Sequence, residues 1–101
     1  MYGTIARMKV ASGKEQAFLD FTNDIGKEGG SPRPKGMKYV YVYKSDADPS
    51  EYFLVVGFDS RESYRANAES PEQHEQYLKM RDWMAAEPEW HDGEVVHTDI
   101  V

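Results

Sequence analysis

Two neighbouring segments of the sequence are apolar on both of their alternating faces, and this feature limits the folds open to the chain. One face of residues 37–44 carries Met37, Tyr39, Tyr41 and Tyr43, and the other carries Val40 and Val42. In residues 52–58 the two faces carry Tyr52, Leu54, Val56 and Phe58 against Phe53, Val55 and Gly57. Alternation with a period of two is typical of β-strands. Because only a short turn over residues 46–50 separates the segments, they predict an antiparallel hairpin.

The residues before this hairpin predict a strand followed by a helix. Residues 2–10 alternate apolar and basic side chains from Ala6 to Val10, which favours a strand. Ser12 and Glu15 have the spacing of a capping box, and residues 13–28 then carry apolar side chains at helical spacing. These apolar residues are Ala17, Phe18, Phe21 and Ile25. We expect Gly29 and Gly30 to end this helix, and residues 31–36 to form a loop.

The residues after the hairpin predict two helices and a closing strand. Asp59 or Ser60 is placed to cap a short helix that runs to about residue 67. Ser70, followed by Pro71 and by Gln73 three positions on, predicts the start of a second helix, which we expect Pro88 to end. The valine-rich residues 94–101 then predict the last strand.

The resulting order of elements is β-α-β-β-α-α-β, which predicts a single α+β domain over residues 1–101. With right-handed crossovers, this order gives a ferredoxin-like split β-α-β fold, a four-stranded antiparallel sheet with helices on one face. The helices cover one apolar face of the hairpin, and the other face is left open to water. Because a large exposed apolar patch usually marks an interface, we expect a homodimer whose sheets pack face to face.

Composition and the absence of motifs exclude several classes of function. The 101 residues include no cysteine, and 12 Lys and Arg oppose 18 Asp and Glu for a net charge of −6. An acidic balance argues against nucleic-acid binding, and no apolar run approaches the ~20 residues of a membrane span. The start of the chain lacks the pattern of a signal peptide, so we expect a cytoplasmic protein. No phosphate-binding, serine-hydrolase or zinc-protease motif occurs, and residues 87–92 are interpreted as a solvated turn without a metal.

Several of these segments resemble the antibiotic biosynthesis monooxygenase family, whose members form dimeric α+β barrels. The resemblance lies in residues 10–15 after the first strand, the turn at 46–49, residues 55–64, residues 70–74 and the valine-rich end of the chain. It implies a dimeric α+β barrel with a pocket between each sheet and the later helices. It further implies a monooxygenase that acts on an electron-rich aromatic molecule, such as an anthrone or a quinol, without metal, flavin or other cofactor.

The resemblance also assigns candidate site residues. Tyr64 matches a tyrosine of the anthrone oxygenases, and His74 stands near the position of the axial histidine in haem-degrading relatives. We expect these two side chains to be catalytic, handling the proton and the anion. Phe58 stands where relatives have a tryptophan, and Leu54 where the anthrone oxygenases have an asparagine. With these two, the expected substrate-binding residues are Tyr77, Arg81 and Trp83.

Two other functions remain open on the sequence alone. The apolar residues at Leu54 and Phe58 favour a non-catalytic protein that binds haem or a hydrophobic metabolite. A purely structural dimeric module is the third possibility. The tyrosines at 39, 41 and 43 can either pack in a core or interface, or stack against an aromatic ligand.

Overall fold

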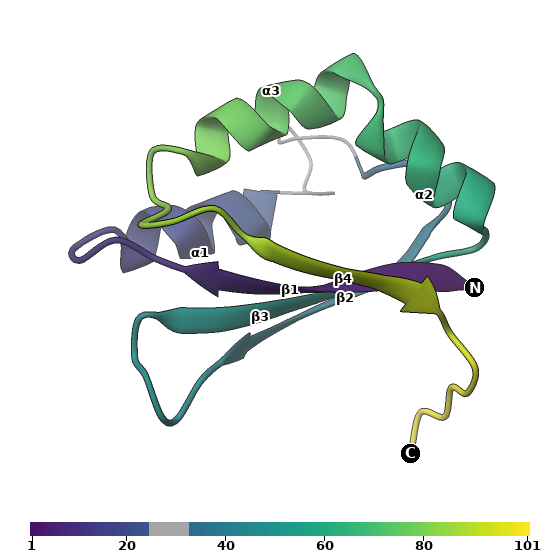
Figure 1. Cartoon of the computed structure of the whole chain (residues 1–101), viewed down its shortest axis with the longest axis horizontal. Coiled ribbons are helices and arrows are strands. Elements are labelled where there is room, and N and C mark those ends of the chain that lie inside the picture. Colours follow the sequence, from purple (N-terminus) through teal and green to yellow (C-terminus); the bar gives the residue numbers. More distant parts are fainter. Residues whose placement is uncertain (25–32) are drawn as a thin grey trace.

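A computed structural model describes residues 1–24 and 33–101 of the chain. The predicted order of elements is confirmed (Figure 1). The elements are β1 (Tyr2–Lys9), α1 (Glu15–Asp24), β2 (Met37–Lys44), β3 (Glu51–Phe58), α2 (Arg61–Ala68), α3 (Pro71–Met80) and β4 (Glu89–Glu94).

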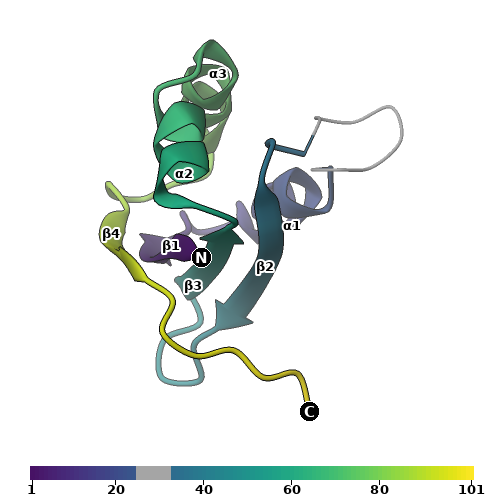
Figure 2. The ribbon, with the colours of Figure 1, turned by 90° about the vertical axis from the view of Figure 1, so that its right-hand side faces the viewer.

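The four strands form one antiparallel sheet in the order β2-β3-β1-β4. The three helices lie over the same face of this sheet, as the two perpendicular views show (Figures 1 and 2). Strands β1 and β2 run in the same direction on either side of β3, so α1 is a crossover connection. The predicted ferredoxin-like arrangement of sheet and helices is therefore confirmed.

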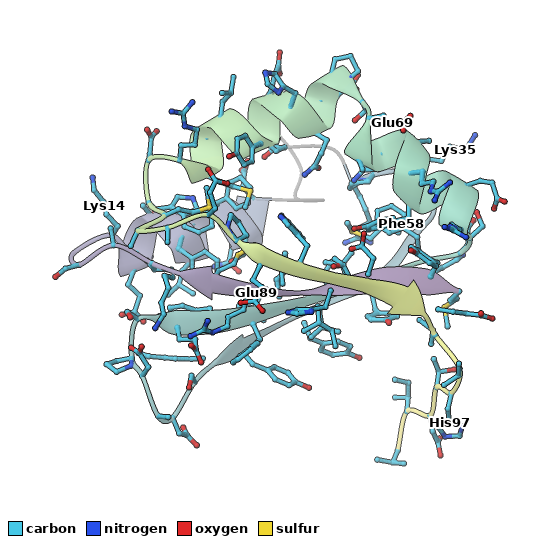
Figure 3. The ribbon with its side chains drawn as sticks, viewed as in Figure 1. Lys14, Lys35, Phe58, Glu69, Glu89 and His97 are labelled. Atoms are coloured by element: carbon cyan, nitrogen blue, oxygen red, sulfur yellow. The ribbon has the colours of Figure 1, made fainter. Side chains whose placement is uncertain are left out.

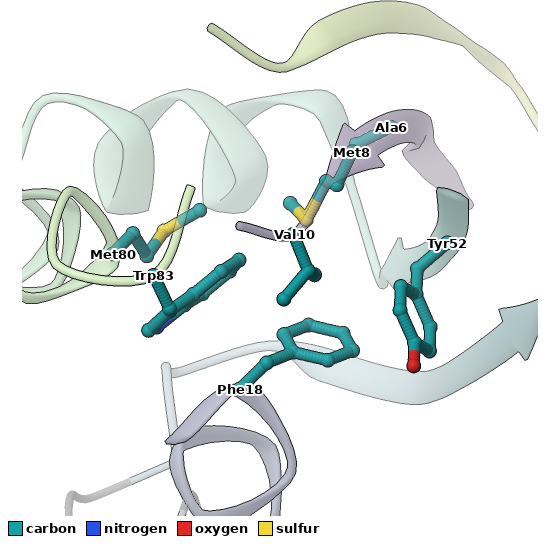
Figure 4. Close-up of a cluster of buried hydrophobic side chains, with 7 residues drawn as sticks. All are labelled: Ala6, Met8, Val10, Phe18, Tyr52, Met80 and Trp83. Carbon is teal, nitrogen blue, oxygen red and sulfur yellow. The ribbon is translucent and has the colours of Figure 1, made fainter. Parts of the chain in front are cut away.

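The hydrophobic core lies between the sheet and α1, at the end of the molecule where β1 leads into α1. Phe18 of α1 packs between Tyr52 and Trp83, with ring centroids 4.6 Å and 4.7 Å away (Figure 4). The predicted alternation of β1 is confirmed, because Ala6, Met8 and Val10 are buried in this cluster. Burying one of the larger apolar side chains stabilises the fold by about 1.5–3 kcal/mol. The cluster therefore holds α1 and the segment after α3 against the sheet.

The helix starts of the second half follow the sequence signals, whereas the first helix does not. The side chains of Ser60 and Ser70 accept the backbone N–H of Ser63 and Gln73, as expected for N-caps. The expected capping box at Ser12 is wrong, because α1 begins only at Glu15. A turn with Gly13 at φ +79° comes first. The expected end of this helix, residues 25–30, lies outside the described residues, as do Ser31 and Pro32 of the predicted loop.

Helix α3 ends at Met80, eight residues before the proline that was expected to end it. Residues after Met80 turn so that Trp83 enters the core and Met84 forms a bridge with Val10. The backbone confirms this docking, since the N–H of Ala11 donates to the carbonyl of Trp83 at 2.8 Å. Burying the indole of Trp83 against Phe18 stabilises the fold more than one further turn of α3 would. An extra helical turn without tertiary contacts contributes little stability.

The closing strand was predicted over residues 94–101, and this prediction is wrong. Strand β4 spans Glu89–Glu94, and it pairs with β1 so that Trp90 lies opposite Ala6 and Asp92 opposite Thr4. The chain already meets β1 at Ala85, whose N–H donates to the carbonyl of Lys9. The chain therefore already lies beside β1 when β4 begins at Glu89. Backbone hydrogen bonds to β1 then outweigh the low strand propensity of these residues. The tail that follows is exposed, and its His97 lies away from the sheet and helices (Figure 3).

One residue of β2 faces the opposite way from the sequence expectation. Met37 pairs with Phe58, but Tyr39 pairs with Gly57, so the register shifts between Met37 and Tyr39. A shift of one residue reverses the face that a strand side chain presents. Met37 therefore lies on the helix side of the sheet, whereas the tyrosines of β2 face the outer side.

Candidate functional site

A cavity of about 600 Å³ lies between the sheet and the helices. Every helix and strand of the described chain contributes to its walls. Most of the wall is apolar, and its main apolar residues are Met8, Phe18, Phe21, Met37, Leu54, Val56, Phe58, Met80 and Trp83. The volume is that of typical small-molecule sites, about 300–1,000 Å³. The cavity can therefore hold a flat apolar molecule of one to a few rings.

Three hydroxyl and carboxyl groups gather where α2 passes over β1 and β4. Thr4 and Asp92 are opposite each other in the β1–β4 register, and both line the cavity. Tyr64 reaches them from α2, and its hydroxyl donates to Asp92 Oδ1 at 2.7 Å. We call Thr4, Tyr64 and Asp92 the hydroxyl cluster. It provides a polar end to an otherwise apolar cavity.

The ring of Tyr64 is fixed by two aromatic neighbours. Its centroid lies 5.3 Å from the ring of Tyr2 and 5.6 Å from that of Phe58, the latter in an edge-to-face contact at 78°. Phe58 points from the sheet toward α2 (Figure 3). Burial first, and then the hydrogen bond to Asp92, raise the pKa of Tyr64 to about 12, and the nearby Thr4 hydroxyl opposes this rise. Tyr64 therefore keeps its proton at neutral pH and is not a base there.

The hydroxyl of Thr4 is buried near that of Tyr64 and has no well-formed hydrogen bond to any described residue. Thr4 is 5% exposed, and its Oγ1 makes no hydrogen bond of normal geometry. Buried polar atoms in folded proteins nearly always have a partner, because leaving one unpaired costs about 1–3 kcal/mol. Since Thr4 lines the cavity, a polar atom of a bound molecule can supply this partner.

A second group of polar side chains comes from α3 and the end of α2. His74 lines the cavity and is exposed to solvent, so its imidazole can exchange protons with bulk water. Asn67 Nδ2 lies 3.4 Å from Gln73 Oε1, and both residues line the cavity. The Tyr77 hydroxyl donates to Glu87 at 2.8 Å, and this bond, with burial, raises the pKa of Tyr77. This side of the cavity thus combines hydrogen-bonding groups with one imidazole.

The structure brings all but one of the predicted site residues to the same cavity. The residues that line it are Leu54, Phe58, Tyr64, His74, Tyr77 and Trp83. Arg81 is not among the lining residues, because α3 has already ended and Arg81 is the exposed C-cap. Trp83 is 2% exposed, so most of its ring belongs to the core. The catalytic and binding roles of these residues stay predictions.

Thr4, Trp90 and Asp92 line the cavity but were not among the residues predicted from the sequence. Trp90 and Asp92 were placed in a solvated turn, because no alternation of apolar residues marks β4 in the sequence, and the structure shows that both line the cavity. Thr4 continues the buried series of Ala6 and Met8 toward the start of β1, and that periodicity was sufficient to find it. Asn67 was also missed, although it lies one helical turn after Tyr64.

Across residues 1–24 and 33–101, no three or more His, Asp and Glu side chains form a group suited to a metal ion. Within those same ranges, no helix has the length and apolar character needed to cross a membrane.

Comparison with known proteins gives a family match and several similar folds. The model of the family described as antibiotic biosynthesis monooxygenase matches residues 1–79. A solved structure from Nitrosomonas europaea, provisionally named an antibiotic biosynthesis monooxygenase, is 25% identical, with a TM-score of 0.76 over 96% of this chain and 100% of its own. A protein of the same provisional name from Bordetella bronchiseptica is 22% identical, with a TM-score of 0.77 over 95% and 97%. No functionally curated protein matches the chain.

Proposed function

This chain belongs to the antibiotic biosynthesis monooxygenase family, and we propose that it oxygenates an electron-rich aromatic molecule, such as an anthrone or a quinol, without a cofactor. The cavity carries this proposal, because it joins apolar walls to a polar end. In such a reaction the substrate loses a proton and its anion reduces dioxygen. One oxygen atom enters the ring, and the other leaves as water. The protein binds the ring, accepts the proton and excludes water.

The arrangement of groups around the cavity suggests separate roles for Tyr64 and His74. Tyr64 keeps its own proton and gives it to Asp92, so it can hold a substrate hydroxyl by a hydrogen bond but does not act as the base. His74 is the lining group suited to accept the proton that leaves the substrate, because a neutral imidazole has a nitrogen lone pair that takes up a proton. Its exposure lets it return that proton to water. Leu54, Phe58 and Tyr77 shape the space for the ring.

Dioxygen uptake by the purified, metal-stripped protein tests this proposal. We expect uptake with some member of a panel of anthrones, quinols and naphthols to exceed the autoxidation of that compound. Because a general base contributes about 10²–10⁴-fold, His74→Ala should lower the rate at least tenfold. Tyr64→Phe should raise KM more than it lowers kcat. Glu94→Ala, on β4 but outside the cavity lining, is the control. Equal rates in all of these proteins would contradict the assignment.

The main alternative is a non-catalytic protein that binds haem or a hydrophobic metabolite. This alternative is favoured by the apolar side chains of Leu54 and Phe58, together with His74 in the lining of the same cavity. An imidazole is a common axial ligand of haem iron, so the donor present is suitable. Titration with haemin separates the two functions. A sharp Soret band that His74→Ala abolishes, without dioxygen uptake from any aromatic compound, would favour haem binding over oxygenation.

We also propose that the protein is a homodimer in which two sheets pack face to face as an α+β barrel. The outer face of the sheet supports this, because Ile5, Tyr41 and Tyr43 are 49%, 46% and 60% exposed. Ile5 stands on β1 and the two tyrosines on β2, on either side of β3, and all three lie on the face that α1, α2 and α3 leave uncovered. Their burial against a second copy would remove one aliphatic and two aromatic side chains of this face from water.

A further inference from the structure

The single hydroxyl proton of Tyr64 is directed at Asp92 and not at the cavity. The Tyr64 hydroxyl donates to Asp92 Oδ1 at 2.7 Å, across from α2 to β4. A phenol has one proton to donate and lone pairs that accept. Once that proton is given to Asp92, Tyr64 presents only lone pairs to any molecule in the cavity. Its ring cannot easily turn away, because Tyr2 and Phe58 contact it on two sides.

The neighbours of Tyr64 make the polar end of the cavity rich in acceptors. Asp92 adds carboxylate oxygens, which only accept hydrogen bonds when ionised. Thr4 adds one hydroxyl without a well-formed hydrogen bond, which can donate or accept. The other ionisable lining residues among those described are Arg33, His74 and Tyr77. Tyr77 already donates its own proton to Glu87. Arg61 does not line the cavity. Its guanidinium lies over the ring of Tyr2, and that ring contacts the ring of Tyr64.

We infer that Asp92 makes Tyr64 a hydrogen-bond acceptor, so that the cavity selects aromatic molecules bearing an un-ionised hydroxyl group and disfavours the matching phenolate or ether. The bound hydroxyl donates to Tyr64 Oη, and its oxygen accepts the free proton of Thr4. A phenolate at this position would face the lone pairs of Tyr64 and the carboxylate of Asp92. This inference rests on the proposed function only in taking an aromatic molecule as the occupant of the cavity. In the proposed reaction, the proton that His74 accepts then leaves a different position of the ring from the hydroxyl group held by Tyr64.

Asp92 is a positioning residue in this arrangement, because it acts on the ligand through Tyr64. Without its carboxylate, the Tyr64 hydroxyl is free to turn its proton toward the cavity. Tyr64 would then donate to a phenolate, as residues of an oxyanion site do. The preference for the hydroxyl over the phenolate should therefore disappear or reverse when Asp92 is removed.

The probe for this change in preference is 4-nitrophenol, whose phenol and phenolate forms have different absorption spectra. Its apparent pKa is measured free in solution and with an excess of protein. We expect the wild-type protein to raise this pKa by about one unit, which corresponds to a tenfold preference for the neutral form. Asp92→Ala should abolish or reverse the rise. Glu94→Ala, which removes an acidic residue from the same strand outside the cavity lining, should retain it.

A matched pair of ligands provides a test that does not depend on the Asp92 variant. In 4-nitroanisole a methyl group replaces the hydroxyl proton of 4-nitrophenol, so it cannot donate. Below the pKa of the phenol, the wild-type protein should bind 4-nitrophenol about tenfold more tightly, and Tyr64→Phe should remove this difference. Equal affinities, or an unchanged or lowered pKa of 4-nitrophenol on binding to the wild type, would overturn the inference while leaving an aromatic ligand in place. No spectral change up to millimolar 4-nitrophenol would overturn both the inference and the proposed ligand class.

Discussion

The ring of Tyr39 lies directly over Gly57 on the outer face of the sheet. The two residues are paired across β2 and β3. A Cβ atom on Gly57 would lie 2.0 Å from Cε2 of Tyr39, so only glycine leaves room for this ring. Tyr39 is half-buried as a result, whereas Tyr41 and Tyr43 further along the same face are exposed. An aromatic ring that covers a glycine on the neighbouring strand also fixes the register of the pair.

Gly57→Ala should therefore destabilise the protein by forcing Tyr39 from its position. We expect a loss of about 1–3 kcal/mol in the free energy of unfolding, the usual cost of overpacking, measured by urea denaturation. Gly93→Ala is the control, because a Cβ there meets no atom within 4 Å. Adding Tyr39→Ala to Gly57→Ala should recover part of the loss. Equal effects of the two glycine substitutions would contradict this account.

The exposed tyrosines of β2 should hold the proposed dimer together. Lysines at positions 41 and 43 would place two charges in the face-to-face interface, where burial of an unpaired charge is costly. We expect Tyr41→Lys with Tyr43→Lys to change the wild-type dimer into a monomer at micromolar concentration, as measured by sedimentation velocity. Leu78→Lys is the control, because Leu78 is 45% exposed but belongs to α3 on the other side of the sheet. A monomeric wild type would refute the dimer.

The hydrogen bond from Tyr64 to Asp92 should also make stability depend on pH in alkaline solution. Burial and Asp92 raise the pKa of Tyr64 to about 12, above the value near 10 of an unfolded chain. Tyr64 therefore contributes a stability that is complete below pH ~10 and is lost as the pH rises toward 12. We expect the free energy of unfolding to fall less steeply for Tyr64→Phe than for the wild type above pH ~10. Parallel curves would mean that the phenol is not held as described.

The central part of the fold could be predicted from the sequence because its signals are local. Alternation over eight residues defines β2 and β3, and Ser60 and Ser70 cap helices whose first turns lie beside them. The end of α3 and the position of β4 depend instead on residues far away in the chain. Trp83 leaves the helix because Phe18 offers it a buried contact. Strand β4 is polar, and only the free edge of β1 makes it a strand.

The same division explains which site residues the sequence revealed. Phe58 follows from the alternation of β3, and Tyr64 from its resemblance to family members. Asp92 could not be found as their neighbour while β4 was placed too late in the chain. Arg81 was expected to bind substrate beside the apolar stripe of a longer helix, but α3 ends one residue before it. The wrong end predicted for α3 and the wrong start predicted for β4 therefore led to wrong predictions of site residues.

A final prediction concerns Asp48, in the turn between β2 and β3, which ties that turn to β1. Lys9 Nζ donates to its Oδ2, and the side chain and backbone N–H of Ser50 donate to its Oδ1 at 2.7 Å and 2.9 Å. These three bonds hold the pKa of Asp48 well below its ordinary value near 4. The carboxylate therefore contributes stability above pH ~4 that is lost as the pH falls further.

Asp48→Asn should lower stability at pH 7 and flatten its decline in acid. The amide keeps the size of the side chain but carries no charge for Lys9, so protonation no longer has an ion pair to break. The free energy of unfolding, measured from pH 7 to pH 2, should differ most from the wild type at neutral pH and least at the acid end. Asp46→Asn removes the same charge from the same turn and serves as the control. If Asp46→Asn flattened the acid decline as strongly as Asp48→Asn, net charge and not the contact with Lys9 would be the cause.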